Sequence, residues 1–262
     1  TYQQIRRLLM RGRLQPGQRL ILRTLAAELG VSATPVREAL VRLVSEQALE
    51  LDERGTVMVP KLDLGRYIEV RNLRAGLESE AAFRAAGQVS DADVKALTQL
   101  QERLTASSLE GDYTATREHN ERFHLEVCRL SRSPALFSLI EALWMQSGPI
   151  LSLLWDADGP ANAEAHLIVL DGLRRRDGER ARQGMIRDII YGGAPLLTRF
   201  PGAGTVDSGT LPPPVDLWCG LRALMPPPPG LEPEESPPGP ARGGRAALRK
   251  SRAAGGIVAK RK

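Results

Sequence analysis

The residue types best suited to chemistry are the three histidines of the chain, His119, His124 and His166, together with Asp188. Imidazole nitrogens and carboxylate oxygens are common ligands of divalent transition metals. If these side chains point inward from separate helices, a cation would compensate for what are otherwise costly buried polar groups. The spacing alone is equally consistent with a hydrogen-bonded core histidine and a solvated aspartate. The residues therefore indicate either a metal site or an ordinary core.

Residues 61–200 must supply the helices that position these groups. Asn120 and His124 are four residues apart, so they project from one face of a helix, and His166 and Asp188 fall in two later helical runs. N-cap residues and intervening glycines predict helices at about 63–86, 90–109, 112–131, 134–156, 161–176 and 178–199. The connecting loops are short, which favours an antiparallel all-helical bundle.

Arg74 interrupts the apolar stripe of the first of these helices. The stripe consists of Tyr67, Val70, Arg74, Leu77 and Ala81. An arginine on such a stripe either pairs internally, here with Glu78 or Glu80, or binds an anion. The sequence leaves both alternatives open.

Residues 1–60 have the pattern of a helix-turn-helix. They carry 9 Arg against 6 acidic residues. Gly30 provides the tight turn after one short helix, and a second helix starts at Thr34 with Val36 and Leu40 on its apolar face. The opposite face presents hydroxyl and guanidinium groups at Ser32, Thr34, Arg37 and Arg42. Such groups hold phosphates and read base edges, so the pattern predicts a DNA recognition helix.

Two short alternating runs, 49–51 and 56–59, follow this helix and predict a β-hairpin wing. Arg54 and Gly55 lie in the turn between them. A glycine permits close approach to DNA, and an arginine suits the negative potential of the minor groove. We therefore expect a winged helix-turn-helix that binds double-stranded DNA.

The order of these residues resembles the signature of the GntR family of bacterial transcription regulators. The matching segments are Gly17–Leu20, Leu25–Ser32 and Thr34–Leu40. The residues that the resemblance places on DNA are Arg23, Ser32, Thr34, Arg37, Arg54 and Gly55. Position 33, often an arginine that reads a base in this family, is Ala33 here. Operator recognition is then expected to depend more on Arg23, Arg37 and the wing.

The middle segment resembles the FCD effector domain of the FadR-like branch of this family. The resemblance rests on Asn120–His124, Ser131–Leu136, Glu164–His166 and Asp188. It implies a helical bundle that binds small organic acids, often beside a metal held by one Asp and three His. The implied ligands are Asn120 in place of the usual Asp, His124, His166, and Asp188 in place of the last His. This set of ligands suits Zn²⁺, Mn²⁺ or Ni²⁺. The resemblance also implies that Arg74 binds an effector through its carboxylate.

These features predict a mainly α protein with three segments. They are a DNA-binding winged helix-turn-helix at 1–60, an effector-binding and dimerisation bundle at 61–200, and a basic tail at 201–262. The tail holds 12 of the 19 prolines and is expected to be disordered. The two cysteines, Cys128 and Cys219, cannot form a disulfide framework. No apolar run suits a bilayer and no secretory signal is evident, so a cytoplasmic protein without membrane contact is expected.

The predicted function is a one-component transcription regulator, a repressor that binds a palindromic operator as a homodimer and responds to a small acid. One alternative is a metal-dependent hydrolase, since two histidines and an aspartate can activate water. Neither a nucleophile elbow nor a phosphate loop nor a dinucleotide fingerprint supports an enzyme. The other alternative is an architectural DNA-binding protein whose effector domain is vestigial.

Overall fold

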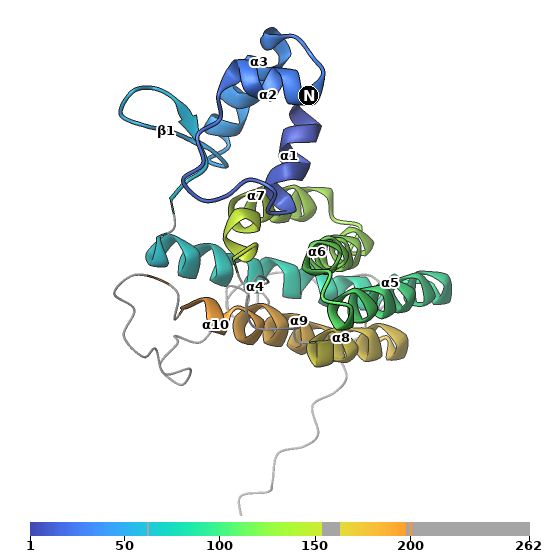
Figure 1. Cartoon of the computed structure of the whole chain (residues 1–262). Helices are drawn as coiled ribbons and strands as arrows, with labels where there is room; N and C mark the ends of the chain where they lie inside the picture. Colours follow the sequence, from blue (N-terminus) through green and yellow to red (C-terminus); the bar gives the residue numbers. More distant parts are fainter. Residues whose placement is uncertain (62, 154–162, 198–199, 201–262) are drawn as a thin grey trace, which may run out of the picture. The chain divides into compact units, whose positions relative to one another are not determined.

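The N-terminal part of the chain folds into three helices and a small hairpin (Figure 1). The computed structural model describes residues 1–61, 63–153, 163–197 and 200. The N-terminal elements are α1 (Tyr2–Met10), α2 (Leu22–Leu29), α3 (Ala33–Ser45), β1 (Glu50–Leu51) and β2 (Val57–Met58). Gly30 ends α2 in the left-handed conformation, with φ of 66°, as the tight turn requires. The next helix begins one residue before the predicted Thr34, with Ser32 at its N-cap position.

The wing contains one more paired segment than the sequence predicts. Strands β1 and β2 are antiparallel, with Glu50 opposite Met58. The backbone of residues 18–20 joins their outer edge, because the Leu20 N–H donates to the Val57 oxygen at 2.8 Å and the Val59 N–H donates to the Gln18 oxygen at 2.9 Å. This pairing fixes the base of the wing to the chain segment that leads into α2.

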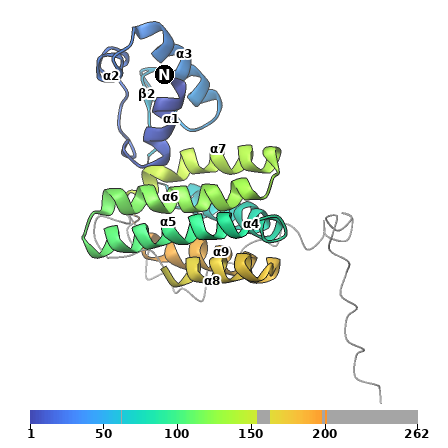
Figure 2. The same cartoon turned by 90° about the vertical axis from the view of Figure 1, so that its right-hand side faces the viewer.

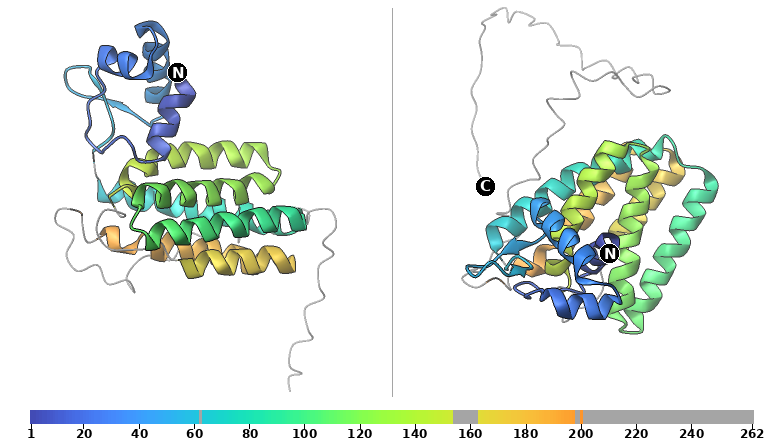
Figure 3. Two further views of the ribbon diagram at one scale, coloured as in Figure 1. Left: turned by 45° about the vertical axis from the view of Figure 1, so that its right-hand side comes forward. Right: turned by 90° about the horizontal axis from the view of Figure 1, so that it is seen from above.

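The rest of the described chain is an all-helical bundle in three layers (Figures 1 and 2). Its helices are α4 (Leu64–Ala86), α5 (Asp91–Leu109), α6 (Tyr113–Leu130), α7 (Pro134–Leu151), α8 (Ala163–Arg175), α9 (Gly178–Gly192) and α10 (Ala194–Leu197). Helices α4, α5 and α6 form the middle layer, with α7 on one side and α8 and α9 on the other. Figure 3 shows these helices of the bundle from two further directions.

The capping residues explain where several body helices begin. The Asp63 carboxylate accepts from the Arg66 N–H, and the Asp177 carboxylate accepts from the Arg180 N–H. Ser90 and Asp93 form the reciprocal capping box at the start of α5. These starts agree with the sequence prediction.

Two helix ends differ from the prediction. The helix expected over 178–199 is interrupted at Gly193, because Pro195 has no N–H to continue the helical hydrogen bonds and the Tyr67 hydroxyl binds the Gly193 oxygen at 2.9 Å. The helix expected over 134–156 ends at Leu151. The predicted disorder of 201–262 lies outside the described residues, and the division into domains at residue 60 stays a prediction.

Besides a smaller cluster of Tyr67, Ile150, Leu197 and Phe200, two larger apolar cores hold the described part of the structure together. One joins the N-terminal helices to α7, and its members include Ile5, Leu9, Leu40, Leu43, Ile140 and Trp144. The other fills the bundle between α4, α5, α6, α8 and α9, with Leu97, Phe123, Leu173 and Met185 among its members. Among the described residues no helix is both long and apolar enough to cross a membrane.

Candidate functional site

The buried polar side chains of the bundle converge on His124, His166 and Asp188. These residues come from α6, α8 and α9, and all three are buried. The Nε2 atoms of the two imidazoles are 3.2 Å apart. Asp188 places Oδ2 at 2.9 Å from Nε2 of His124 and Oδ1 at 3.4 Å from Nε2 of His166. Three potential metal ligands therefore face one point, as the sequence predicts for these three residues.

Each imidazole is oriented by an oxygen on its far side. The Nδ1 of His124 donates to Glu78 Oε2 at 2.8 Å, and the Nδ1 of His166 donates to Gln101 Oε1 at 2.6 Å. These bonds leave the Nε2 atoms directed at each other and at Asp188. Metal-bound histidines are commonly held by such outer hydrogen bonds, which fix both the tautomer and the ring orientation. The polar set thus has the inner and outer partners of a metal site.

The spacing of the two imidazole nitrogens and the two Asp188 oxygens also fits a single cation, and one ligand atom from each of the three residues lies within 4.8 Å of the others. Ligand atoms bound at about 2.1 Å lie about 3.0 Å apart at octahedral angles and about 3.4 Å apart at tetrahedral angles. The two nitrogens are 3.2 Å apart, and each lies 2.9 or 3.4 Å from one Asp188 oxygen, which is close to these values. Two nitrogens and one oxygen suit Zn²⁺, Mn²⁺ or Ni²⁺, and three ligands leave coordination positions for another molecule.

The charges in this cluster are strongly coupled. Burial opposes the protonated form of His124, but the carboxylates of Asp188 and Glu78 raise its pKa to about 9. Burial lowers the pKa of His166. Burial also disfavours the ionised form of Asp188, yet the neighbouring His166 and His124 hold the pKa of this carboxyl well below its ordinary value. Glu78 stays ionised for a similar reason, because Arg74 and His124 offset its burial and lower its pKa.

Arg74 extends the cluster toward α7. Its Nε donates to Glu78 Oε1 at 2.6 Å, and its Cζ lies 3.9 Å from the ring centroid of Trp144. The sequence left open whether Arg74 pairs internally or binds an anion, and the structure shows that it pairs with Glu78. The terminal nitrogens of Arg74 make no hydrogen bond with another described residue. The side chain can thus hold Glu78 and still donate to a ligand.

His119 and Asn120, two further polar residues of α6 named in the sequence analysis, do not belong to the triad. His119 is half-buried, and its Nδ1 lies 3.3 Å from Ser107 Oγ, away from the triad. Asn120 lies one turn before His124 on α6 and is half-buried, so its role as fourth ligand stays a prediction. Sequence reasoning missed Gln101 and Trp144 entirely. Their positions on apolar helix faces carry no local signal of a polar role.

The DNA-facing groups predicted from the sequence are all exposed. They are Arg23 on α2, Ser32 and Thr34 and Arg37 at the start of α3, and Arg54 and Gly55 at the wing tip. By contrast, Arg42 is engaged within the protein, because its Nε donates to Glu46 at 2.8 Å and its guanidinium covers the Tyr2 ring. The exposed groups predicted to contact DNA therefore lie on α2, in the N-terminal part of α3 and at the wing.

Asp52 organises the wing, a role that sequence reasoning missed. Its Oδ1 accepts from the backbone N–H groups of Arg54 at 2.9 Å and Thr56 at 2.8 Å, and its Oδ2 lies 3.0 Å from Arg19 Nε. The backbone hydrogen bond from Thr56 is the main reason why the pKa of Asp52 is lowered. Asp52 followed three residues later by Gly55, whose φ is 73°, is the local signal that could have indicated this turn.

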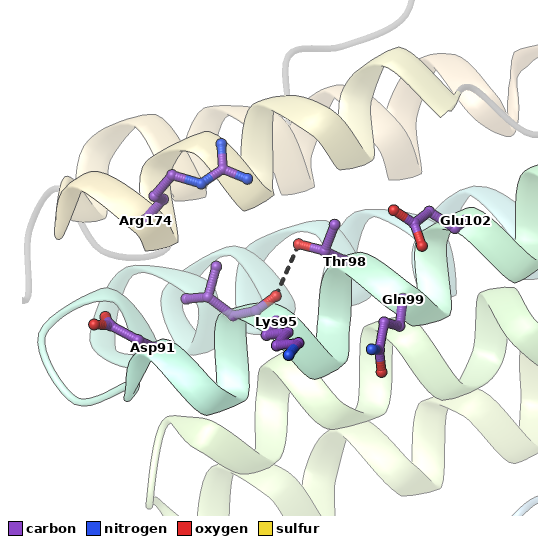
Figure 4. Close-up of a pocket in the computed structure, with 7 residues that line it drawn as sticks. Asp91, Lys95, Thr98, Gln99, Glu102 and Arg174 are labelled. Carbon is purple, nitrogen blue, oxygen red and sulfur yellow. Dashed lines mark hydrogen bonds between the residues drawn. The ribbon is translucent and has the colours of Figure 1, made fainter.

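A separate surface groove lies between α5 and α8 (Figure 4). Asp91, Lys95, Glu102 and Arg174 line it with both signs of charge, and the Thr98 hydroxyl within it donates to its own helix at the Val94 oxygen. The side chains named here are exposed except for Thr98 and Val94. This groove does not contain the histidines or Asp188.

An exposed recognition helix and wing, joined to a bundle with a buried polar site, are the parts of a ligand-responsive DNA-binding regulator. The comparisons with known proteins agree. The profile described as bacterial regulatory proteins, gntR family, matches residues 1–59, and the FCD domain profile matches residues 69–190. The HTH-type transcriptional regulator McbR of Escherichia coli (strain K12) is 36% identical over 175 residues, which are 65% of this chain and 79% of that protein.

Solved structures give the same result. The structure titled E. coli McbR/YncC matches with a TM-score of 0.71 and 33% identity, over 76% of this chain and 95% of that chain. A putative transcriptional regulator GntR from Rhodococcus sp. RHA1 matches with a TM-score of 0.63 and 19% identity, over 76% of this chain and 96% of that chain, which supports the fold alone. The chain belongs to the GntR family of bacterial transcription regulators, in the branch that carries an FCD domain.

Proposed function

We propose that this regulator is a cytoplasmic repressor that binds a palindromic operator as a homodimer and changes its DNA affinity when a small carboxylate effector binds. Residues 1–60 are the DNA-binding domain and residues 61–200 the effector and dimerisation domain. The DNA contacts are assigned to Arg23, Ser32, Thr34, Arg37, Arg54 and Gly55. The effector binds beside a divalent cation at Asn120, His124, His166 and Asp188, with Arg74 as an anion-binding group.

The observation that carries this proposal is the arrangement of the two imidazoles. Both Nδ1 atoms are bonded to oxygens of Glu78 and Gln101, and both Nε2 atoms face Asp188. The outer oxygens fix both rings so that two nitrogens and a carboxylate face one point, which is the arrangement that a cation needs. When bound, a cation supplies positive charge and open coordination positions to a carboxylate. The surrounding residues hold the rings in place and exclude water.

The connection to DNA runs along the helices that form the site. Helix α6 carries His124 and, one turn earlier, Glu121, which lies 3.5 Å from Arg11 at the end of α1. Helix α7 carries Trp144 and, one turn earlier, Glu141, which pairs with Arg6 of α1. Because each helix is a rigid element, a shift at the site is expected to reach the N-terminal helices through these contacts.

The test combines metal binding with DNA binding in the full chain. An operator is first selected from random double-stranded DNA, and its affinity is then measured with and without one equivalent of Ni²⁺, Zn²⁺ or Mn²⁺. Metal should raise the melting temperature, because it binds the folded state. His124→Ala and His166→Ala should each abolish this rise. His119→Ala is the matched control, since this histidine lies on α6 outside the triad, and it should leave the rise intact.

Each part of the proposal can fail separately. Wild-type protein that folds but binds less than about a tenth of an equivalent of all three metals at neutral pH would rule out the metal site. Selection that enriches no palindrome would rule out operator binding as a homodimer. Operator affinity that responds to no organic acid would contradict effector sensing and favour an architectural role.

A further inference from the structure

Arg71 is a buried cation whose hydrogen-bonding capacity is largely unused. Arg71 is 3% exposed, and among the described residues its side chain hydrogen-bonds only to Asn72, whose Oδ1 lies 3.2 Å from Nη2 and 3.4 Å from Nε. Its Cζ also lies 5.9 Å from the centroid of the Tyr67 ring. Its Nη1 is buried and has no hydrogen-bond partner among the residues that the structure describes. Burial lowers the pKa of Arg71, which reflects the cost of keeping this charge away from water. A buried guanidinium without a carboxylate is expensive unless an anion reaches it.

Arg71 lies on the same helix as Arg74 and faces the end of the helix that carries Asp188. Arg71 and Arg74 are three residues apart on α4, so they lie on one side of the helix and about one turn apart. A Cβ built on Gly193, just after α9, would lie 3.5 Å from Arg71 Cδ. The same helix α9 carries Asp188 of the triad. Arg71 therefore lies along the α4–α9 contact, on the side where α9 ends.

Two further donors near the triad are also free. The Trp144 Nε1 is buried and has no hydrogen-bond partner in the described part of the chain, and the Trp144 ring centroid lies 5.4 Å from that of His124. The Trp144 ring also contacts the guanidinium of Arg74, whose terminal nitrogens are unused by described residues. Buried polar groups are nearly always paired in native proteins. Several unused donors around one site therefore point to an acceptor-rich ligand.

The charge of the cluster indicates how many negative charges this ligand carries. In net charge, the buried guanidinium groups of Arg71 and Arg74 cancel the buried carboxylates of Glu78 and Asp188. A divalent cation with neutral imidazoles then leaves an uncompensated charge of about +2 in a buried site. The other buried acidic groups are occupied elsewhere, because Glu80 pairs with Arg182 and Glu121 with Arg11. A dianion would neutralise the site, whereas a monoanion would leave one positive charge buried.

We infer that the effector is a small dicarboxylate, with one carboxylate at the metal triad and Arg74 and the other held by Arg71. This inference rests on the proposed function and names the chemical class of the effector. Two carboxylates on one chain suit donors about one helical turn apart better than a single centre that carries both charges. Arg71 is then the residue that distinguishes a diacid from a monoacid, because only a diacid reaches it while it is bound at the metal.

The experiment compares diacids with monoacids of equal length on the full chain loaded with one equivalent of Ni²⁺. Isothermal titration is carried out with malonate, succinate and glutarate, and with propionate, butyrate and valerate. We expect the best diacid to bind at least about ten-fold more tightly than the monoacid of its length, the effect of one charge-assisted hydrogen bond. Arg71→Met should remove this preference and leave monoacid binding within about two-fold of wild type.

Arg84→Met is the matched control, since Arg84 lies on the same helix but pairs with Glu80. It should keep the diacid preference. Arg71→Lys keeps the charge and should retain part of the preference, and the wild-type comparison stands even if Arg71→Met does not fold. Acids that bind without any diacid preference would overturn this inference and leave effector sensing intact. If no acid of either series binds the nickel-loaded protein, effector sensing itself fails, and this inference fails with it.

Discussion

We predict that the proposed metal site and the stability of the bundle both depend on Glu78. It is fully buried on α4, where one oxygen accepts from Arg74 at 2.6 Å and the other from His124 at 2.8 Å. Glu78→Gln keeps the size of the side chain but removes its negative charge. Two effects should follow, a loss of folding free energy and a loss of metal affinity.

Both magnitudes follow from these contacts. Removing one partner of a buried ion pair leaves the other charge uncompensated, at a cost of about 3–5 kcal/mol. Removing the outer hydrogen-bonding partner of a metal-bound histidine lowers metal affinity by about 10–100-fold. For a domain of this size, the stability loss corresponds to a fall in melting temperature of about 6–20 °C. The loss of charge also makes the His124 imidazole a weaker metal ligand, so the two effects have one origin.

Glu80→Gln provides the matched control. Glu80 is also buried on α4, and it pairs with Arg84 at 2.8 Å and Arg182 at 2.7 Å, but it makes no contact with the triad. Melting followed by circular dichroism in the presence of a chelator gives the stability of each variant. Competition with a chelating dye gives the affinity for Zn²⁺ or Ni²⁺. Both variants should be destabilised, but only Glu78→Gln should bind metal less tightly.

The reasoning is refuted if Glu78→Gln folds and binds metal within about two-fold of wild type. It is also refuted if Glu80→Gln loses metal affinity to the same extent, because the loss would then reflect general loosening of α4. A fall in stability alone would show that Glu78 is only a structural partner of Arg74.

Three other changes test different parts of the structure. Gly148→Ala should destabilise the protein by about 1–2 kcal/mol in urea unfolding, because its methyl group would overlap the backbone at the end of α1, and this overlap outweighs the gain in helix propensity. Gly87→Ala should be neutral or stabilising, because Gly87 is in the right-handed conformation and a Cβ there would meet only the Arg84 oxygen at 3.8 Å. Equal effects at the two positions would contradict close packing of α1 on α7. Metal binding near pH 7 should release about one proton, because His124 has a pKa of about 9 and must lose its proton before it can bind the metal. Metal affinity should therefore rise with pH up to about 9 and then level off. Titration calorimetry in buffers of different ionisation enthalpy measures this release, and a heat independent of the buffer would contradict it. Arg37→Ala should weaken operator binding by about 1–3 kcal/mol at unchanged helical content. Arg42→Ala should have a smaller effect on operator binding, because the Arg42 side chain is hydrogen-bonded to Glu46. If Arg37→Ala weakens binding to operator and random DNA equally, Arg37 contacts a phosphate instead of a base.

The sequence by itself determined most of the secondary structure and singled out the two histidines and the aspartate that the bundle brings together. Helix starts such as Asp63, Ser90 and Asp177 were predictable because an N-cap is a contact between residues two or three positions apart. The turn at Gly30 was predictable because a left-handed backbone conformation, which glycine adopts readily, is also a local property. The histidines and Asp188 could be selected because such residues are rare on apolar helix faces and chemically distinctive.

The tertiary structure decided which groups meet. Glu78 and His124 are 46 residues apart in sequence, and Gln101 and His166 are 65 apart, so no local pattern connects them. Helix α9 ends where Tyr67, far away in the chain, binds Gly193. The unused donors of Arg71 and Trp144 likewise become visible only when every neighbour is in place, because a missing partner is a property of the whole packed interior. Local patterns fix what each helix presents, but the packing of the helices against one another determines what each side chain touches.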